Sequence, residues 1–135
     1  MKIINTFSDD NIKQVHQLYK EVWWGKDRSL EDTFECVKGS QICIGIIDSC
    51  GKLIGFARVI SDFIYKAIIF DVIVSSAHRS SGLGQTLMDL VKNHDNLQKV
   101  KHFELYCLPE MEGFYSRLGF TTDVGGIHLM RCINN

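Results

Sequence analysis

Residues 71–84 read DVIVSSAHRSSGLG and join the end of an apolar strand to the start of an amphipathic helix. The strand reaches back to Ala67 and is apolar except for Asp71, as expected of a strand that is covered on both faces. The helix places Leu83 and Leu87 on one face. The first N–H groups of a helix have no internal partner, and the helix dipole is positive there. We therefore expect the loop between strand and helix to bind an anion.

The loop has the residue types that a phosphate site needs. Gly82 and Gly84 let the backbone approach a phosphate closely, and Ser80 and Ser81 can donate their hydroxyl groups. Arg79 adds a positive charge that can pair with phosphate in a bidentate manner. This combination predicts a pyrophosphate as the ligand.

Other phosphate-binding loops fit less well. A P-loop would place Lys and then Ser or Thr directly after the last glycine, where this chain has Gln85 and Thr86. A dinucleotide fingerprint would place a third glycine where Leu87 stands. Nucleoside-triphosphate hydrolysis and nicotinamide or flavin chemistry are therefore disfavoured. The remaining alternative is a glycine-softened helix start that binds nothing.

Before this segment, the sequence predicts a short strand, two helices and an antiparallel hairpin. Ser8 offers an N-cap oxygen to the first helix, and Ser29, with Asp32 three residues later, offers one to the second. A turn at residues 49–52 joins the strands of the hairpin. The predicted elements cover residues 2–7, 9–22, 30–38, 41–48 and 53–60.

After the helix that begins near Leu83, the sequence predicts a strand, a helix and a last strand, at residues 102–107, 109–118 and 127–133. Pro109 suits a first helical turn, and Gly119 can end that helix with a positive φ. This order of elements predicts an α/β (α+β) fold, with a mixed, largely antiparallel central sheet and helices on both faces. We expect a single domain over residues 1–135.

The composition disfavours several classes of partner. Among 135 residues, 15 Lys and Arg stand against 16 Asp and Glu, so no overall positive field attracts nucleic acid or an anionic membrane. No stretch resembles a membrane span or a secretory signal, so we expect a cytoplasmic protein. The five cysteines include no C-x-x-C pair and have no His at metal-ligand spacing, which predicts reduced structural thiols and no metal site.

Residues 71–84 and a second block, FYSRLGF at residues 114–120, resemble two segments of the GNAT superfamily of acetyl-CoA-dependent N-acetyltransferases. The first is similar to the family's signature loop, Q/R-x-x-G-x-G/A. The second is similar to its aromatic-Tyr-x-x-Leu-Gly-Phe segment. The resemblance implies a GNAT-like acyl-CoA N-acyltransferase fold, acetyl-CoA as co-substrate, no metal, and direct transfer of the acetyl group to a primary amine in a ternary complex.

The same resemblance implies which residues contact the co-substrate. The backbone of Val72, Ile73 and Val74 would pair with the pantetheine arm, and Tyr115 would point at the thioester sulfur. The N–H groups that cradle the pyrophosphate, with the Arg79 side chain beside them, would belong to Ser80, Ser81, Gly82, Leu83, Gly84 and Gln85.

Acetyl transfer needs a neutral amine, a donor for the developing oxyanion and a proton for the departing thiolate. A strand N–H at Val72 or Ile73 can be the donor, and the Tyr115 hydroxyl can supply the proton. Alternatively, Tyr115 is an aromatic residue at the edge of the core. Asp71 and Glu104 are the candidate bases, and Asp71 could equally be a structural acid bonded to Arg58.

The acceptor site is predicted near the segment that joins the two early helices. Trp23, Trp24 and Arg28 would form aromatic and charged walls there, and Asp62 could hold a cationic amine. Alternatively, one Trp lies in the core and the other at its edge. No charged run suggests a peptide groove, so we expect a small-molecule amine. A protein or peptide amine, and a non-catalytic acyl-CoA-binding regulatory module, are the alternatives, and a homodimer stays open.

Overall fold

The computed structural model describes residues 1–134, whose five strands form a sheet in the order β1-β2-β3-β4-β5. Neighbouring strands are antiparallel except for β4 and β5, which are parallel. The predicted mixed, largely antiparallel sheet is therefore confirmed. The strands are β1 (Lys2–Ile4), β2 (Ile42–Ile47), β3 (Leu53–Ser61), β4 (Lys66–Val74) and β5 (His102–Leu105).

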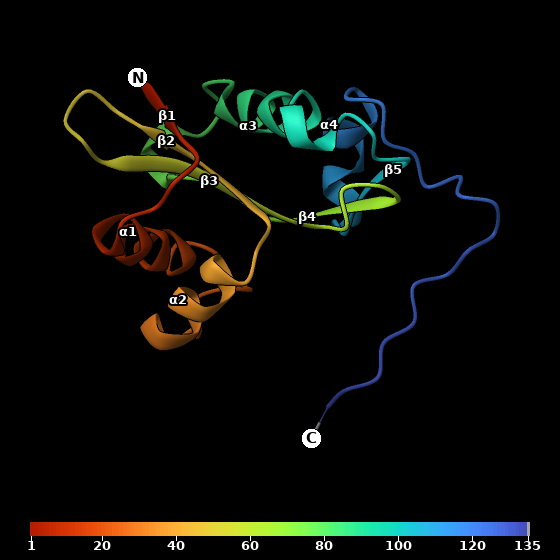
Figure 1. The fold of residues 1–135 in the computed structure, drawn as a ribbon, viewed down its shortest axis with the longest axis horizontal. Coiled ribbons are helices and arrows are strands. Elements are labelled where there is room, and N and C mark those ends of the chain that lie inside the picture. Colours follow the sequence, from red (N-terminus) through yellow and green to blue (C-terminus); the bar gives the residue numbers. More distant parts are fainter. Residues whose placement is uncertain (135) are drawn as a thin grey trace.

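Helices cover both faces of this sheet, as predicted (Figure 1). α1 (Asp9–Tyr19) and α2 (Leu30–Lys38) lie on one face, and α3 (Leu83–Lys92) and α4 (Glu112–Ser116) lie on the other. Each face has its own apolar cluster, one around Tyr19 and Phe56 and one around Ile44 and Leu87. Across residues 1–134, no helix combines the length and the apolar character that a membrane crossing requires.

The helix ends follow from short-range capping. The Ser8 hydroxyl accepts a hydrogen bond from the Asn11 N–H (3.1 Å), and the Asn11 side chain accepts one from the Ser8 N–H (2.9 Å). The Ser29 hydroxyl accepts from the N–H of Asp32 at 3.0 Å, as predicted. After α4, Gly119 has a φ of 95°, which glycine adopts without steric cost.

Strand β4 has two irregularities. The register between β3 and β4 shifts opposite Asp71, whose φ of 57° lies in the left-handed region. This arrangement is a β-bulge, which bends the strand, and Asp is one of the few residue types that tolerate its first position. β5 pairs only with residues 66–69 of β4, so the two strands diverge beyond Ile69. Within residues 1–134, the second half of β4 therefore has a backbone edge that no strand covers.

The predicted strand at residues 127–133 is wrong. In the described part of the chain, no strand follows β5, and the segment extends away from the body of the molecule (Figure 1). Its apolar side chains at Ile127, Leu129, Met130 and Ile133 are 61–89% exposed. A strand needs the backbone groups of a neighbour for its N–H and C=O, and this segment meets none among residues 1–134. At the other end of the chain, β1 stops at Ile4 instead of reaching Phe7.

Candidate active site

The start of α3 has the features of an anion-binding site. Gly82 precedes the helix with a φ of 85°, no side chain caps the helix in the described residues, and its first turn contains no acidic residue. The first helical N–H that has a backbone acceptor is that of Thr86, which donates to the Gly82 carbonyl at 3.1 Å. The N–H groups of Leu83, Gly84 and Gln85 are therefore available to a ligand, and the helix dipole adds a positive potential.

The preceding loop is held in a turned conformation. Ser80 has a φ of 63°, and the Ser81 hydroxyl donates to the carbonyl of His78. Arg79 donates from Nε to the carbonyl of Val74 at 3.3 Å, which ties the loop to the end of β4. The Arg79 and Ser80 side chains are exposed, whereas the Ser81 hydroxyl is already used inside the loop. The loop therefore offers an anion mainly its backbone groups, with the Arg79 and Ser80 side chains beside them.

The free edge of β4 lies next to this loop. The Ser75 N–H donates to the Ile54 carbonyl of β3 at 2.8 Å, so the backbone of Ser75 faces β3. Successive residues of a strand direct their N–H and C=O groups to alternate edges. Val72 and Val74 therefore face the gap left by β5, and Ile73, which pairs with Phe56, faces β3.

Tyr115 lies beside the start of α3. A Cβ on Gly84 would lie 3.4 Å from Cζ of Phe114, so the glycine allows close approach of α4 to α3. The Tyr115 ring packs edge-on against Phe114 and Phe120, with centroids 5.0 and 6.1 Å away. Burial, and then the charge of Cys107, raise the pKa of the Tyr115 hydroxyl above its ordinary value. Tyr115 is therefore a phenol at neutral pH and can donate a proton.

Asp71 lies at the centre of a buried polar network. Its Oδ2 accepts hydrogen bonds from Nε of Arg58 (2.5 Å), Nη1 of Arg28 (2.7 Å) and the hydroxyl of Tyr19 (2.8 Å). Burial of the carboxylate, which is 5% exposed, favours its neutral form, but the two guanidinium groups outweigh this and hold the pKa of Asp71 below its usual range. Asp71 is therefore ionised and a weak proton acceptor.

The predicted acceptor residues are only partly brought together. The Arg28 guanidinium lies over the rings of Tyr19 and Trp24, at 4.6 and 5.1 Å from their centroids. Trp24 and Arg28 therefore join the Asp71 network on the α1 face of the sheet. Trp23 is 69% exposed and lies outside this cluster.

Glu104 and Asp62 lie elsewhere. Glu104 forms a salt bridge with Lys66 at 2.9 Å and stands opposite Ile68, four residues before Val72, which is about 13 Å along an extended strand. The Asp62 carboxylate accepts hydrogen bonds from the N–H groups of Ile64, Tyr65 and Lys66. These bonds hold the pKa of Asp62 below its usual range. Asp62 therefore stabilises the turn between β3 and β4.

Two members of the site are absent from the sequence-based predictions. Tyr19 looks like a core residue because it lies at helical spacing on the apolar face of α1, but its buried hydroxyl bonds Asp71. A buried tyrosine usually needs a polar partner, and this was the available signal. Cys107 lies close enough to Tyr115 to raise its pKa, which nothing in the local sequence indicates.

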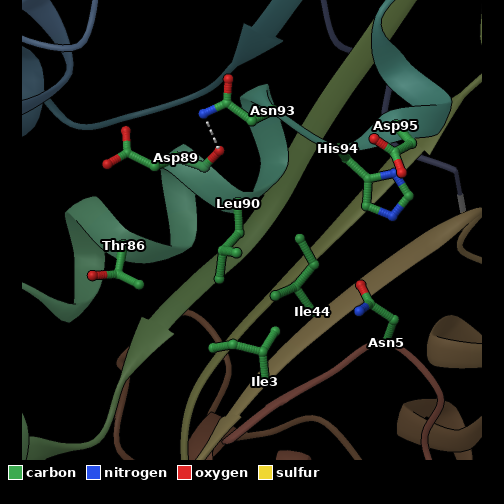
Figure 2. A pocket seen from close by; sticks show the side chains of 9 residues that line it. All are labelled: Ile3, Asn5, Ile44, Thr86, Asp89, Leu90, Asn93, His94 and Asp95. Carbon is green, nitrogen blue, oxygen red and sulfur yellow. Dashed lines mark hydrogen bonds between the residues drawn. The ribbon is translucent and has the colours of Figure 1, made fainter. Parts of the chain in front are cut away.

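A cavity of about 450 Å³ lies away from these residues, between the end of α3 and the edge of the sheet formed by β1 and β2 (Figure 2). Ile3, Ile44 and Leu90 line its apolar side, and Asp89, His94 and Asp95 line its polar side. Nδ1 of His94 already accepts a hydrogen bond from the Asn96 N–H at 3.1 Å. Across residues 1–134, no three His, Cys, Asp or Glu side chains are arranged to hold a metal ion.

The Asp71 network predicts acid sensitivity. Because the folded-state pKa of Asp71 lies below its unfolded value of about 3.9, the stabilisation is complete above that pH and is lost as the pH falls through the folded-state pKa. We expect the melting temperature to fall more steeply below about pH 4 in the wild type than in Asp71→Asn. Thermal unfolding followed by circular dichroism between pH 7 and pH 2 measures this difference, and parallel curves would contradict it.

Comparisons with known proteins identify the family of this chain. The family model of the acetyltransferase (GNAT) domain matches residues 38–122. The uncharacterized N-acetyltransferase ycf52 of Porphyra purpurea is 32% identical over 120 residues, covering 87% of this chain and 68% of its own. Serotonin N-acetyltransferase 2, chloroplastic, of Oryza sativa subsp. japonica is 33% identical over 82 residues, covering 61% of this chain and 41% of its own.

Solved structures show the same fold. A protein of Xanthomonas campestris pv. campestris, described as belonging to the GNAT family of acetyltransferases, is 31% identical with a TM-score of 0.82, covering 99% of this chain and 94% of its own. An aminoglycoside 6′-N-acetyltransferase complexed with coenzyme A is 19% identical with a TM-score of 0.66, covering 78% of this chain and 61% of its own. The matched domain, the ycf52 relative and the Xanthomonas structure show that this chain belongs to the GNAT family and is an N-acetyltransferase.

Proposed function

We propose that this enzyme transfers the acetyl group of acetyl-CoA to the primary amine of a small molecule, by direct attack in a ternary complex. The observation that supports this most strongly is the uncapped start of α3 beside the free edge of β4. A pyrophosphate fits the start of α3, because its charge complements the free N–H groups and the helix dipole. The pantetheine arm, which contains amide groups, fits the free edge of β4, because it can pair with the exposed strand backbone.

The residues around this gap suit acetyl transfer. Bound acetyl-CoA would supply a reactive thioester. The N–H of Val72 faces the gap and can donate to the oxygen on which negative charge develops, whereas the backbone of Ile73 faces β3. The Tyr115 hydroxyl, kept protonated by its raised pKa, can give its proton to the departing thiolate.

We assign Asp71 a positioning role. Its carboxylate fixes Arg28 and Arg58 on the α1 face, and its lowered pKa makes it a poor base for an ammonium group. Glu104 forms a salt bridge with Lys66. It stands opposite Ile68 of β4, which is four residues before Val72. We therefore propose that the amine loses its proton to water before attack.

We propose that the acceptor approaches over Trp24 and Arg28. Both residues contact the Asp71 network next to Val72, and Trp24 is 37% exposed. An aromatic wall suits an amine with an apolar group, and a serotonin N-acetyltransferase among the relatives supports an amine of that kind. A peptide amine is the second candidate acceptor. Two expectations stay predictions: that residues 1–135 form one domain and that the protein is cytoplasmic.

Release of free thiol from acetyl-CoA, measured with a panel of small amines and lysine peptides, tests this function. Turnover with a small amine supports the proposal, and turnover with peptides alone favours the second acceptor class. Binding of acetyl-CoA without turnover of any amine would instead indicate a regulatory acyl-CoA-binding module.

The substitution Gly82→Ala is expected to weaken coenzyme A binding. Gly82 has a φ of 85°, and a left-handed alanine costs about 1 kcal/mol, so the loop is expected to relax and move its N–H groups. We expect the dissociation constant, measured by calorimetry, to rise about tenfold. Gly51→Ala is the matched control, because Gly51 has a φ of 83° and equally open surroundings in the β2–β3 turn. Equal changes in affinity for both variants would refute the assignment of the loop.

A further inference from the structure

Arg28 and Arg58 share a single carboxylate. Both guanidinium groups donate to Oδ2 of Asp71, at 2.7 and 2.5 Å. Among residues 1–134, no other acid forms a salt bridge with either arginine. Burial, and then the charge of Asp71, raise the pKa of the Tyr19 hydroxyl, so Tyr19 adds no negative charge at neutral pH. With two cations and one anion, this network has an excess of positive charge.

Arg28 is the member of this network that reaches the surface. Its side chain is 34% exposed, whereas those of Arg58 and Asp71 are 13% and 5% exposed. Nη1 of Arg28 bonds Asp71, and no other N–H of this guanidinium donates a hydrogen bond within residues 1–134. The same part of the chain contains no buried side-chain nitrogen or oxygen without a partner, so the free donors of Arg28 face solvent. An anion can therefore reach them directly.

The Arg28 guanidinium is fixed by its neighbours. It lies over the rings of Tyr19 and Trp24, at 4.6 and 5.1 Å from their centroids, while Asp71 holds one of its nitrogens. The main chain is held as well, because the Arg28 carbonyl lies 2.9 Å from Nε2 of His16. A planar guanidinium that is fixed on one side and open on the other suits a carboxylate or a phosphate, which can accept two parallel N–H bonds.

This guanidinium lies next to the proposed reacting centre. Asp71, which Arg28 contacts, directly precedes Val72 in β4, and the N–H of Val72 faces the gap between β4 and β5. An acceptor whose amine enters the gap at Val72 can therefore place a nearby substituent against Arg28. Trp24, which is 37% exposed and lies under the same guanidinium, can cover an apolar part of that acceptor.

We propose that the acceptor is an amine that also carries an anionic group, a carboxylate or a phosphate, and that Arg28 binds this group while the amine lies at Val72. The inference rests on the proposed acetyl transfer and narrows its class of acceptor. A bound anion balances the excess charge of the network. A diamine or a lysine-rich peptide would instead bring another cation next to two guanidinium groups, so these acceptors are disfavoured.

Matched pairs of amines test this selectivity. Phenethylamine and phenylalanine, and pentylamine and ε-aminocaproate, differ by a carboxylate, and ethanolamine and phosphoethanolamine differ by a phosphate. We expect kcat/KM of the wild type to be about 30-fold higher for the anionic member of at least one pair, as charge-assisted hydrogen bonds allow. Hexamethylenediamine, in which an ammonium replaces the carboxylate, should react no faster than pentylamine. A faster reaction of the diamine than of any anionic amine overturns the inference.

Arg28→Gln should lower this ratio to about one, mainly by raising the KM of the anionic amine. Arg28→Lys keeps the charge without the planar fork and should retain part of the ratio. Lys26→Gln is the matched control, because it removes an exposed cation two residues earlier in the same segment and should leave the ratio unchanged. If Arg28 only positioned Asp71, Arg28→Gln would slow both members of each pair alike and leave the ratio as it is.

Binding of an anion without an amine separates this inference from the proposed function. Hydrocinnamate should bind the wild type about tenfold more tightly than Arg28→Gln in calorimetry, with hydrocinnamyl alcohol as the uncharged reference. Such binding without turnover of any amine would overturn the proposed function and support the anion site. A ratio of rates that Arg28→Gln leaves unchanged would overturn the inference and leave acetyl transfer intact. If no amine reacts and hydrocinnamate binds both proteins equally, both proposals fail.

Discussion

Tyr115→Phe is expected to lower kcat by about 100-fold and to change the KM for acetyl-CoA by no more than about twofold. The ring keeps its packing against Phe114 and Phe120, so only the hydroxyl is lost. Without this proton donor the thiolate must leave unprotonated or take its proton from water. Steady-state kinetics with the best amine from the panel measure both constants.

Tyr65→Phe is the matched control for this substitution. Tyr65 is 63% exposed on the hairpin between β3 and β4, and the same hydroxyl deletion there should leave kcat unchanged. If Tyr115→Phe alters KM alone, Tyr115 binds the co-substrate but does not donate the proton. If it alters neither constant, Tyr115 is a packing residue at the edge of the core.

Asp71→Asn is expected to lower the free energy of unfolding at pH 7 by about 3 kcal/mol. Asn has the same shape and also tolerates the φ of 57°, so the substitution isolates the charge. It leaves Arg28 and Arg58 in a partly buried site without the carboxylate that both of them contact. An unpaired charge in such a site is costly because it has lost part of its hydration. Urea denaturation at pH 7 measures the change.

Glu104→Gln is the control for Asp71→Asn. Glu104 also pairs with a cation, but both side chains of that pair are nearly half exposed, so its removal should cost less than about 1 kcal/mol. The two variants also separate the candidate bases. If Asp71 only positions the two arginines, kcat of a folded Asp71→Asn should show the same pH dependence as the wild type. A kcat that no longer rises with pH would restore Asp71 as the base.

Much of the site could be predicted because its parts are close in sequence. The anion site depends on a loop and the helix that directly follows it, so Gly82 and the first N–H groups of α3 lie where the sequence indicates. The strand at β4 was also predictable, but which of its residues face the free edge was not. That depends on the hydrogen bond from Ser75 to β3 and on the divergence of β5, which involve two other strands.

Local interactions specify the capped helices, the glycine loop and the order of elements as far as α4, because these depend on contacts within a few residues. Ser8 bonds Asn11, three residues later, in any fold that lets the helix form. The tertiary structure fixes the surroundings of Asp71, whose partners lie 13, 43 and 52 residues away in the chain. It also decided the state of residues 127–133, because a strand forms only where a neighbouring backbone is within reach. Local propensity therefore specified the elements, and long-range contacts specified what each polar group does.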